Sequence, residues 1–152
     1  MAPKSIDLHS LGRHVGREVG VSDWLTVTQE RINQFAEATD DRQWIHVDPA
    51  RAGVESPYKA PVAHGFLTLS LVSVLLRQAV TISGLRMAIN YGANRLRFVS
   101  AVPAGSRIRG RFVLAAVEEA GGGVQAIWHA TIERESEQKP ACVIEWLVRY
   151  YS

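Results

Sequence analysis

The sequence predicts an α+β fold in which one antiparallel β-sheet wraps around a single long apolar helix. Two observations lead to this fold class. Residues 65–79 are apolar around nearly the whole circumference of a helix, which is typical of a helix buried on all sides. The second half of the chain then changes to the two-residue period of half-buried strands. Such a helix, followed by about four antiparallel strands, is covered only if the sheet curves around it.

Length and composition indicate one globular domain over residues 1–152. Of the 152 residues, 47% are hydrophobic and 21% are charged, which is typical of a folded protein. The 17 basic and 15 acidic side chains leave a net charge of +2, without a block of like charge or a nucleic-acid recognition motif. We therefore expect no nucleic-acid partner.

The chain carries no signal for export or membrane insertion. Its first residues lack the apolar core of a signal peptide, and no apolar run reaches the roughly 18 to 20 residues that cross a bilayer. The single cysteine, Cys142, lies in an alternating apolar segment and is interpreted as a small core residue. These features predict a cytoplasmic protein without a membrane span.

The expected elements follow in chain order. Residues 15–25 are a weak strand candidate, and a clear helix begins after Thr28, which suits the N-cap position, and ends near Ala38. Residues 39–58 are rich in Asp, Pro and Gly and predict a loop with one helical turn around residues 50–53. Beyond the apolar helix, strand patterns cover residues 87–98, 107–112, 124–132 and 142–150, with the glycines at 121–123 forming a turn.

Three residues in and after the predicted loop suggest proton chemistry beside a carbonyl group. Asp41 and His46 lie five positions apart, and Gly65 opens the apolar helix. A carboxylate and an imidazole can share one water molecule as acid and base, while free N–H groups at a helix start can bind an oxygen that gains negative charge. Each residue also has a purely structural interpretation: Asp41 as a turn residue, His46 as a histidine bonded to backbone, and Gly65 as a tight turn into the helix.

The surrounding pattern resembles the MaoC-like (R)-specific enoyl-CoA hydratases, a family with the hotdog fold. Their pattern is F-A-x-x-[ST]-x-D-x-x-x-x-H-x-D-x-x-x-A, followed later by A-H-G. The matching positions are Phe35, Ala36, Thr39, Asp41, His46, Asp48, Ala52, Val62, Ala63, His64, Gly65 and Phe66. A second family motif is matched by N-Y-G-A-N-R-L-R-F, which begins at Asn90.

The resemblance implies that Asp41 and His46 hold one water molecule over a trans-2-enoyl thioester, with Gly65 at the oxyanion hole. The product would be the (R)-3-hydroxyacyl thioester, carried by CoA or by an acyl carrier protein, and no cofactor is implied. No metal site is expected, since the five histidines are dispersed and no metal-ligand motif is present. A homodimer is expected, because a single such domain leaves a sheet edge and a long substrate unsheltered.

Further residues have a possible role at the site. The resemblance places Asn90 and Tyr91 where they either line or brace the site or are purely structural. It places Ser73 where some relatives have a serine that contacts the catalytic aspartate. His64 either shapes the site or bonds loop backbone. The strand arginines either meet the phosphates of CoA or an acidic carrier protein, or simply form a solvated face; they are Arg95, Arg97, Arg107, Arg109 and Arg111.

One departure from the family pattern concerns substrate choice. Trp44 stands between Asp41 and His46 where many relatives have proline. Its ring either narrows the acyl tunnel or packs the loop against the helix of residues 28–38. Two other functions remain open for the chain: a hotdog thioesterase, and a non-catalytic subunit that binds acyl-CoA.

Overall fold

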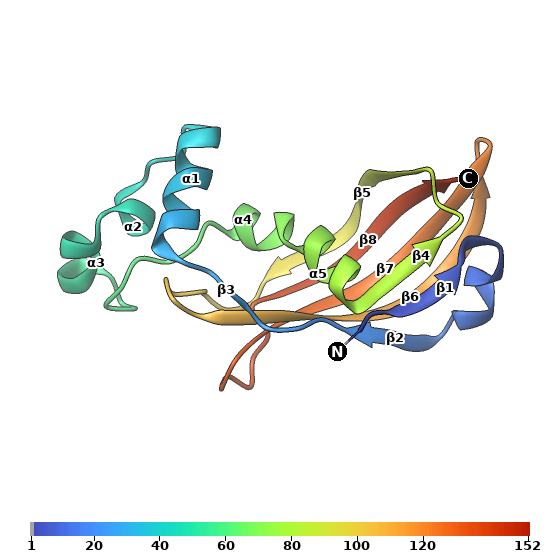
Figure 1. The fold of residues 1–152 in the computed structure, drawn as a ribbon. Helices are drawn as coiled ribbons and strands as arrows, with labels where there is room; N and C mark the ends of the chain where they lie inside the picture. The colour runs from blue at the N-terminus through green and yellow to red at the C-terminus, as the bar shows by residue number, and fades with distance from the viewer. Residues whose placement is uncertain (1) are drawn as a thin grey trace.

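The computed structural model describes residues 2–152 and confirms the predicted class, an antiparallel sheet curved around central helices (Figure 1). The sheet has the strand order β2-β6-β7-β8-β5, and the short strand β3 pairs with β6. A separate parallel pair, which the sequence did not predict, joins β1 to β4. The strands are β1 (Lys4–Asp7), β2 (Arg17–Val21), β3 (Leu25–Thr26), β4 (Val80–Ser83), β5 (Met87–Phe98), β6 (Arg107–Ala120), β7 (Gly123–Arg134) and β8 (Cys142–Tyr151).

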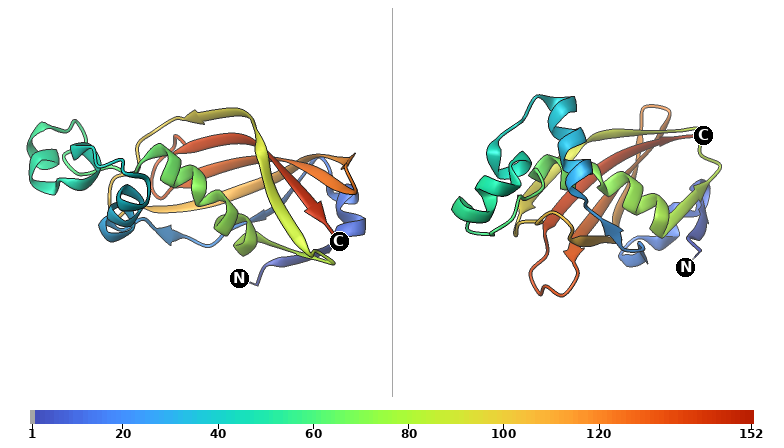
Figure 2. Two further views of the ribbon diagram at one scale, coloured as in Figure 1. Left: turned by 90° about the horizontal axis from the view of Figure 1, so that it is seen from above. Right: turned by 60° about the vertical axis from the view of Figure 1, so that its left-hand side comes forward.

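The helices fall into two groups. The first three α-helices lie beyond one end of the sheet, and the last two α-helices cross its concave face (Figures 1 and 2). A 3-10 helix, η1 (Leu8–His14), follows β1. The α-helices are α1 (Gln29–Thr39), α2 (Trp44–Val47), α3 (Pro49–Glu55), α4 (Gly65–Ser70) and α5 (Val72–Ala79). Within the described residues, no helix combines the length and apolarity needed to span a membrane.

Helix α1 forms where the sequence predicts it. The Thr28 hydroxyl accepts a hydrogen bond from the Arg31 N–H at 3.1 Å, which caps the first turn. At the other end, Asp40 adopts the left-handed conformation with φ 60°, which terminates the helix and turns the chain. Asp41 is therefore the first residue after this turn.

The region predicted as a loop with one helical turn contains two short helices instead. Asp48 caps α3 by accepting the Arg51 N–H at 3.0 Å, and Pro49 occupies the first helical position, where its missing N–H has no cost. The Asp-Pro pair is a local signal for a helix start. The Asp, Pro and Gly content of residues 39–58 as a whole favours a loop, which is why the sequence predicts only one helical turn there.

The apolar helix differs from its prediction in two ways. It is divided at Leu71 into α4 and α5, and the Ser70 hydroxyl bonds back to the Phe66 carbonyl at 2.7 Å, an interaction that bends helices. It is also not buried on all sides: Phe66 is 64% exposed, whereas Leu75 is fully buried. The sheet of one chain covers only one side of the helix, so the other side stays open.

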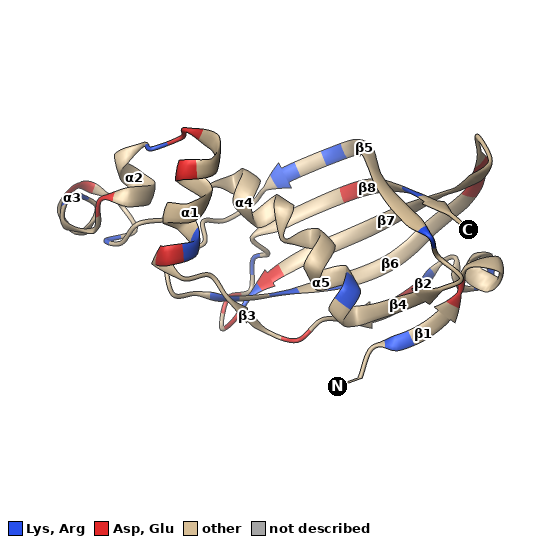
Figure 3. Cartoon of the chain, turned by 45° about the horizontal axis from the view of Figure 1, so that its top comes forward, with Lys and Arg blue, Asp and Glu red and all other residues tan. Residues whose placement is uncertain are grey.

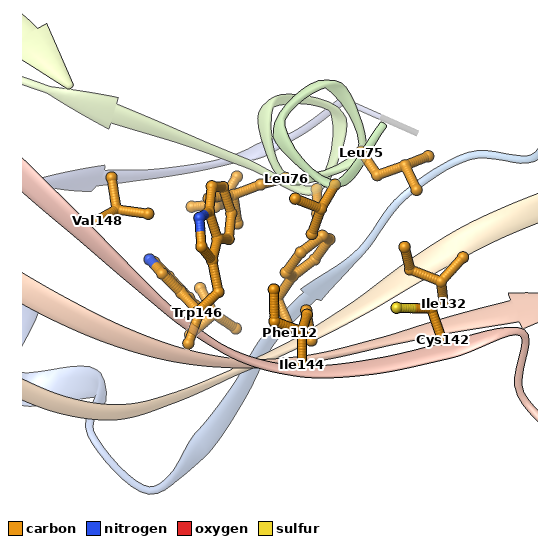
Figure 4. Packing of buried hydrophobic residues seen from close by; sticks show 14 of the residues in the cluster. Leu75, Leu76, Phe112, Ile132, Cys142, Ile144, Trp146 and Val148 are labelled. Carbon is orange, nitrogen blue, oxygen red and sulfur yellow. The ribbon is translucent and has the colours of Figure 1, made fainter. Parts of the chain in front are cut away.

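The core lies between α5 and the sheet. Leu75 and Leu76 point from the helix toward Phe112 and Trp146 on the strands (Figure 4). Cys142 lies in the same cluster, and burial raises the pKa of its thiol to about 11, which confirms that it is a core residue rather than a nucleophile. This packing fixes the helix whose first residue is Gly65.

Candidate active site

The predicted acid and base are brought together beside the start of α4. One carboxylate oxygen of Asp41 and one ring nitrogen each from His46 and His64 lie within 4.8 Å of one another. Asp41 is exposed, whereas His46 and His64 are only 7% and 3% exposed. The proximity of Asp41 and His46 agrees with the sequence prediction, and His64, for which the sequence leaves two roles open, both lies beside them and bonds loop backbone.

Three hydrogen bonds connect the segment of Asp41 to His46 with the segment of Val62 to His64. The Val62 N–H donates to the Ile45 carbonyl at 2.9 Å, and His46 Nδ1 donates to the Val62 carbonyl at 2.6 Å. The third bond is donated by His64 Nε2 to the main-chain carbonyl of Asp41 at 2.9 Å. We call these three bonds the clamp. Because Gly65 follows His64 directly, the clamp also sets the start of α4 relative to the acid and base.

The clamp determines which nitrogen of His46 is available for chemistry. A carbonyl oxygen can only accept, so His46 Nδ1 carries the proton and Nε2 keeps its lone pair. The Gln29 side chain also holds the His46 main-chain carbonyl at 2.8 Å, a contact from α1 that the sequence did not indicate. His46 is thus oriented at both its ring and its backbone, as a general base requires.

The surroundings of His46 favour its neutral form. Burial lowers the pKa of the ring and the neighbouring His64 lowers it further, while the bond to the Val62 carbonyl and the charge of Asp41 oppose this change. The net result is a pKa below the ordinary value of 6.5. At neutral pH the lone pair on Nε2 is therefore free to take a proton.

Gly65 lies in close contact with an aromatic pair at the mouth of the site. A Cβ atom at this position would stand 2.8 Å from the ring of Phe98, so only glycine fits without displacing that ring. Phe98 in turn makes an edge contact with Phe66 at a centroid distance of 5.9 Å. The first N–H groups of a helix have no carbonyl partner within it, so those of α4 are available beside these rings.

Two further candidates lie together at a distance along the helix. Ser73 and Asn90 both line a groove of about 500 Å³ between α5 and the strands β5 and β8, with Trp146 on its wall. The groove continues toward α4, where Leu69 and Ser70 line it. Its walls are largely apolar, which suits an acyl chain.

Tyr91 lines the part of this groove near α4, whereas Trp44 lies on the outer helix α2. Tyr91 is 57% exposed, and its ring faces the Arg149 guanidinium at 3.7 Å. The pairing of β5 with β8 is irregular between Asn90 and Gly92, so the simple alternation of side chains along the strand is broken at Tyr91. The ring of Trp44 is half-buried and lies 4.3 Å from the guanidinium of Arg51 in α3.

A comparison with known families accounts for this arrangement. Residues 10–133 match the family described as MaoC like domain. The chain belongs to this family. The expected family and the hotdog fold are therefore confirmed.

Individual relatives support the same placement of this MaoC-like chain. It is 51% identical over 141 residues to 3-hydroxyacyl-thioester dehydratase Z of Mycobacterium tuberculosis, which covers 92% of this chain and 93% of that protein. Nodulation protein N of Rhizobium leguminosarum is 44% identical over 149 residues, with 93% and 89% covered. Among solved structures, the (R)-hydratase from A. caviae involved in PHA biosynthesis matches with a TM-score of 0.69 and 25% identity, covering 88% of this chain and 96% of that one.

The three clustered side chains of this MaoC-like site are of types that also bind metal ions, but their arrangement does not suit one. The rings of His46 and His64 are stacked, with centroids 3.8 Å apart and planes inclined by 24°. Their in-plane lone pairs therefore run nearly parallel and cannot converge on one ion at the roughly 2.0–2.1 Å that zinc requires. A water molecule accepts the longer distances of about 2.7–3.2 Å.

The arginines of β6 are paired with carboxylates, and Figure 3 shows residues of both charges along the strands of the sheet. Arg109 and Arg111 bond Glu133 at 2.7 and 2.6 Å, and Arg107 bonds Glu135 at 2.8 Å. Such paired cations are poor ligands for phosphate. The structure therefore favours the solvated-face interpretation for these three residues.

Proposed function

We propose that this protein adds water to trans-2-enoyl thioesters to form (R)-3-hydroxyacyl thioesters, and catalyses the reverse dehydration. The observation that carries the proposal is the clamp, which holds a base with a free Nε2 next to the Asp41 carboxylate and the start of α4. The membership of the chain in the MaoC-like family and its 51% identity to a dehydratase support the same chemistry.

The reaction needs one water molecule and no covalent intermediate. Asp41 and His46 orient the water, and His46 Nε2 takes one of its protons as the oxygen bonds to C3. The electrons of the C2–C3 double bond move toward the thioester oxygen, which gains negative charge beside the N–H groups at Gly65. The proton then passes from His46 to C2, and the thioester carbonyl is restored.

The groove between α5 and β5 is the proposed location of the acyl chain. It leads away from α4, and its apolar wall includes Leu76 and Trp146. Helical rise is about 1.5 Å per residue, so Ser73 lies roughly 12 Å along the helix from Gly65. A thioester bound at Gly65 therefore directs its chain toward Ser73 and Asn90.

The test is hydration of crotonyl-CoA, followed by loss of absorbance of the conjugated thioester, with chiral analysis of the product. Asp41→Asn and His46→Gln are each expected to reduce kcat/KM by about 10²- to 10⁴-fold, because the first removes the carboxylate that orients the water and the second removes the base that carries its proton. The double variant should lose little more than either single variant, since the residues act on one water molecule.

Other outcomes would point to the rival functions. Release of free CoA thiol without hydration would indicate a thioesterase. Tight binding of acyl-CoA with no turnover of short-chain or long-chain substrates would indicate a binding subunit. Wild-type kcat/KM in both single variants would contradict the assignment of Asp41 and His46.

We also infer that the protein is a homodimer that buries strand β5. This strand is the last in the sheet order, so among the described residues its outer edge has no partner. Met87, Ile89 and Tyr91 on this strand are 42%, 43% and 57% exposed, and the open side of α4 lies nearby with Phe66. A long exposed edge with apolar side chains is usually covered in a stable protein.

A further inference from the structure

His64 is a buried histidine whose ring contacts and hydrogen bond connect it to both proposed catalytic residues. Its ring is stacked on His46 at 3.8 Å and inclined by 54° to Phe35 at 4.9 Å, so it is enclosed between two aromatic neighbours. Its Nε2–H donates to the main-chain carbonyl of Asp41. Its Nδ1 is buried and has no hydrogen-bond partner among residues 2–152. A buried polar atom without a protein partner calls for a specific explanation.

Of the three bonds of the clamp, only the one donated by His64 fixes the backbone of Asp41. The Asp41 side chain is exposed and lies just after the left-handed turn at Asp40. A residue at that place is free to move unless its backbone is fixed. Apart from the bond from His64, no hydrogen bond to Asp41 is present within the described part of the chain.

We propose that His64 is the positioning residue of the active site: its Nε2–H holds the backbone of Asp41 in place beside His46. The proposal rests on the proposed hydration by Asp41 and His46. A water molecule shared by two side chains reacts only if both lie at the right distance, and a misplacement of about 1 Å can cost roughly 10²-fold in rate.

Three substitutions separate the hydrogen bond from the packing of the ring. His64→Gln places an amide N–H at the same number of bonds from Cα as Nε2, but it has no ring. His64→Asn carries the same amide on a side chain that is one bond shorter and cannot reach the Asp41 carbonyl. His64→Phe keeps a stacking ring without any donor. If the role were only structural, the phenylalanine variant would be the mildest of the three.

The proposal predicts the opposite order in kcat. The glutamine variant should lose no more than roughly threefold, whereas the asparagine and phenylalanine variants should each lose about 10²-fold. KM for crotonyl-CoA should change little in all three, because His64 acts on the placement of Asp41 and not on substrate binding. Equal kcat in the glutamine and asparagine variants would overturn the proposal. That pair decides the question even if the phenylalanine variant fails to fold.

A spectroscopic measurement tests the clamp without any turnover. Nitrogen-15 NMR of the histidine rings should show the proton of His64 on Nε2 and that of His46 on Nδ1 in the wild-type protein. In the asparagine variant the backbone chemical shifts of Asp41 should move toward the values of a mobile loop. In the glutamine variant they should remain unchanged. A His64 proton on Nδ1, or an Asp41 signal that is unchanged in the asparagine variant, would overturn the positioning role. Absence of hydration in the wild-type protein, with these signals as expected, would instead reject the proposed function alone.

Discussion

The tautomer and the pKa of the His46 imidazole are set by groups that come from different parts of the chain. The carbonyl of Val62 fixes the proton on Nδ1, and burial favours the neutral ring. The titratable side chains that act on it are Asp41 from its own segment and His64 from the loop before α4, while Gln29 of α1 contacts its backbone and is uncharged. The proposed general base therefore depends on the fold as much as on the residue type.

The lowered pKa of His46 predicts the shape of the pH profile. A base must be neutral to accept a proton, so hydration should be constant near neutral pH and fall only below the ordinary imidazole value of 6.5. The measurement is kcat/KM for crotonyl-CoA between pH 5 and 8. An acid limb with its midpoint above 6.5 would contradict the effect of burial on this ring.

The lowered pKa of His46 also makes the free energy of unfolding depend on pH. The folded-state pKa lies below the unfolded one, so the contribution of His46 is complete above about pH 6.5 and is lost as the pH falls toward the folded value. His46→Gln should therefore reduce the loss of unfolding free energy between pH 7 and pH 5. His129→Gln, which replaces an exposed histidine on β7, is the matched control and should leave that loss unchanged.

At the scale of elements, the start of α4 depends on the contact between Gly65 and Phe98. Gly65→Ala should destabilise the protein by about 1–3 kcal/mol, because the new methyl group overlaps the Phe98 ring. Adding Phe98→Ala should restore part of this loss, and urea unfolding of the four proteins measures the coupling. Gly53→Ala is the control, since nothing lies within 4 Å of a Cβ atom there. Purely additive losses would show that the two residues do not meet.

Helices α2 and α3 are linked by Trp44 and Arg51, which bears on the two roles left open for Trp44. Its ring lies under a guanidinium, a contact worth about 0.5–1 kcal/mol at an exposed site. We therefore expect Trp44→Ala to lower the melting temperature and to leave the ratio of kcat/KM for long and short enoyl chains unchanged. A ratio that rises for long chains would show instead that the ring narrows the acyl path.

The sequence predicted the elements that have a strong local signal and missed those that depend on distant contacts. Helix α1, the strands β5, β7 and β8, the first part of β6 and the turn at the glycines follow from caps and periodicity, whereas β6 continues to Ala120, beyond the predicted end at residue 112. The parallel pairing of β1 with β4 joins residues about 75 positions apart, and nothing local specifies it. Likewise, Asp41 and His46 were recognised by their pattern, but the role of the Val62 carbonyl is invisible in a sequence, because any residue supplies a carbonyl.

At the scale of the whole molecule, the structure differs from the sequence prediction in the open side of the central helix. A helix as apolar as α4 and α5 predicted complete burial, yet one chain covers only the side that faces the sheet. The groove with Ser73 and Asn90 opens on the same side, next to the free edge of β5. A second copy placed there would cover the helix and close the groove over an acyl chain, which joins assembly to substrate binding.

The proposed dimer predicts the effect of a charge on β5. A strand of twelve residues spans about 40 Å, enough to anchor an interface of the usual size of roughly 800 Å² per partner. Ile89→Asp places a carboxylate near the start of this edge, where burial against a partner would leave it unpaired. Sedimentation analysis should show a dimer for the wild-type protein and a monomer for this variant. Val54→Asp, at a 75% exposed position in α3, should remain a dimer. A wild-type protein that sediments as a monomer, or an Ile89→Asp variant that stays dimeric, would exclude β5 as the interface.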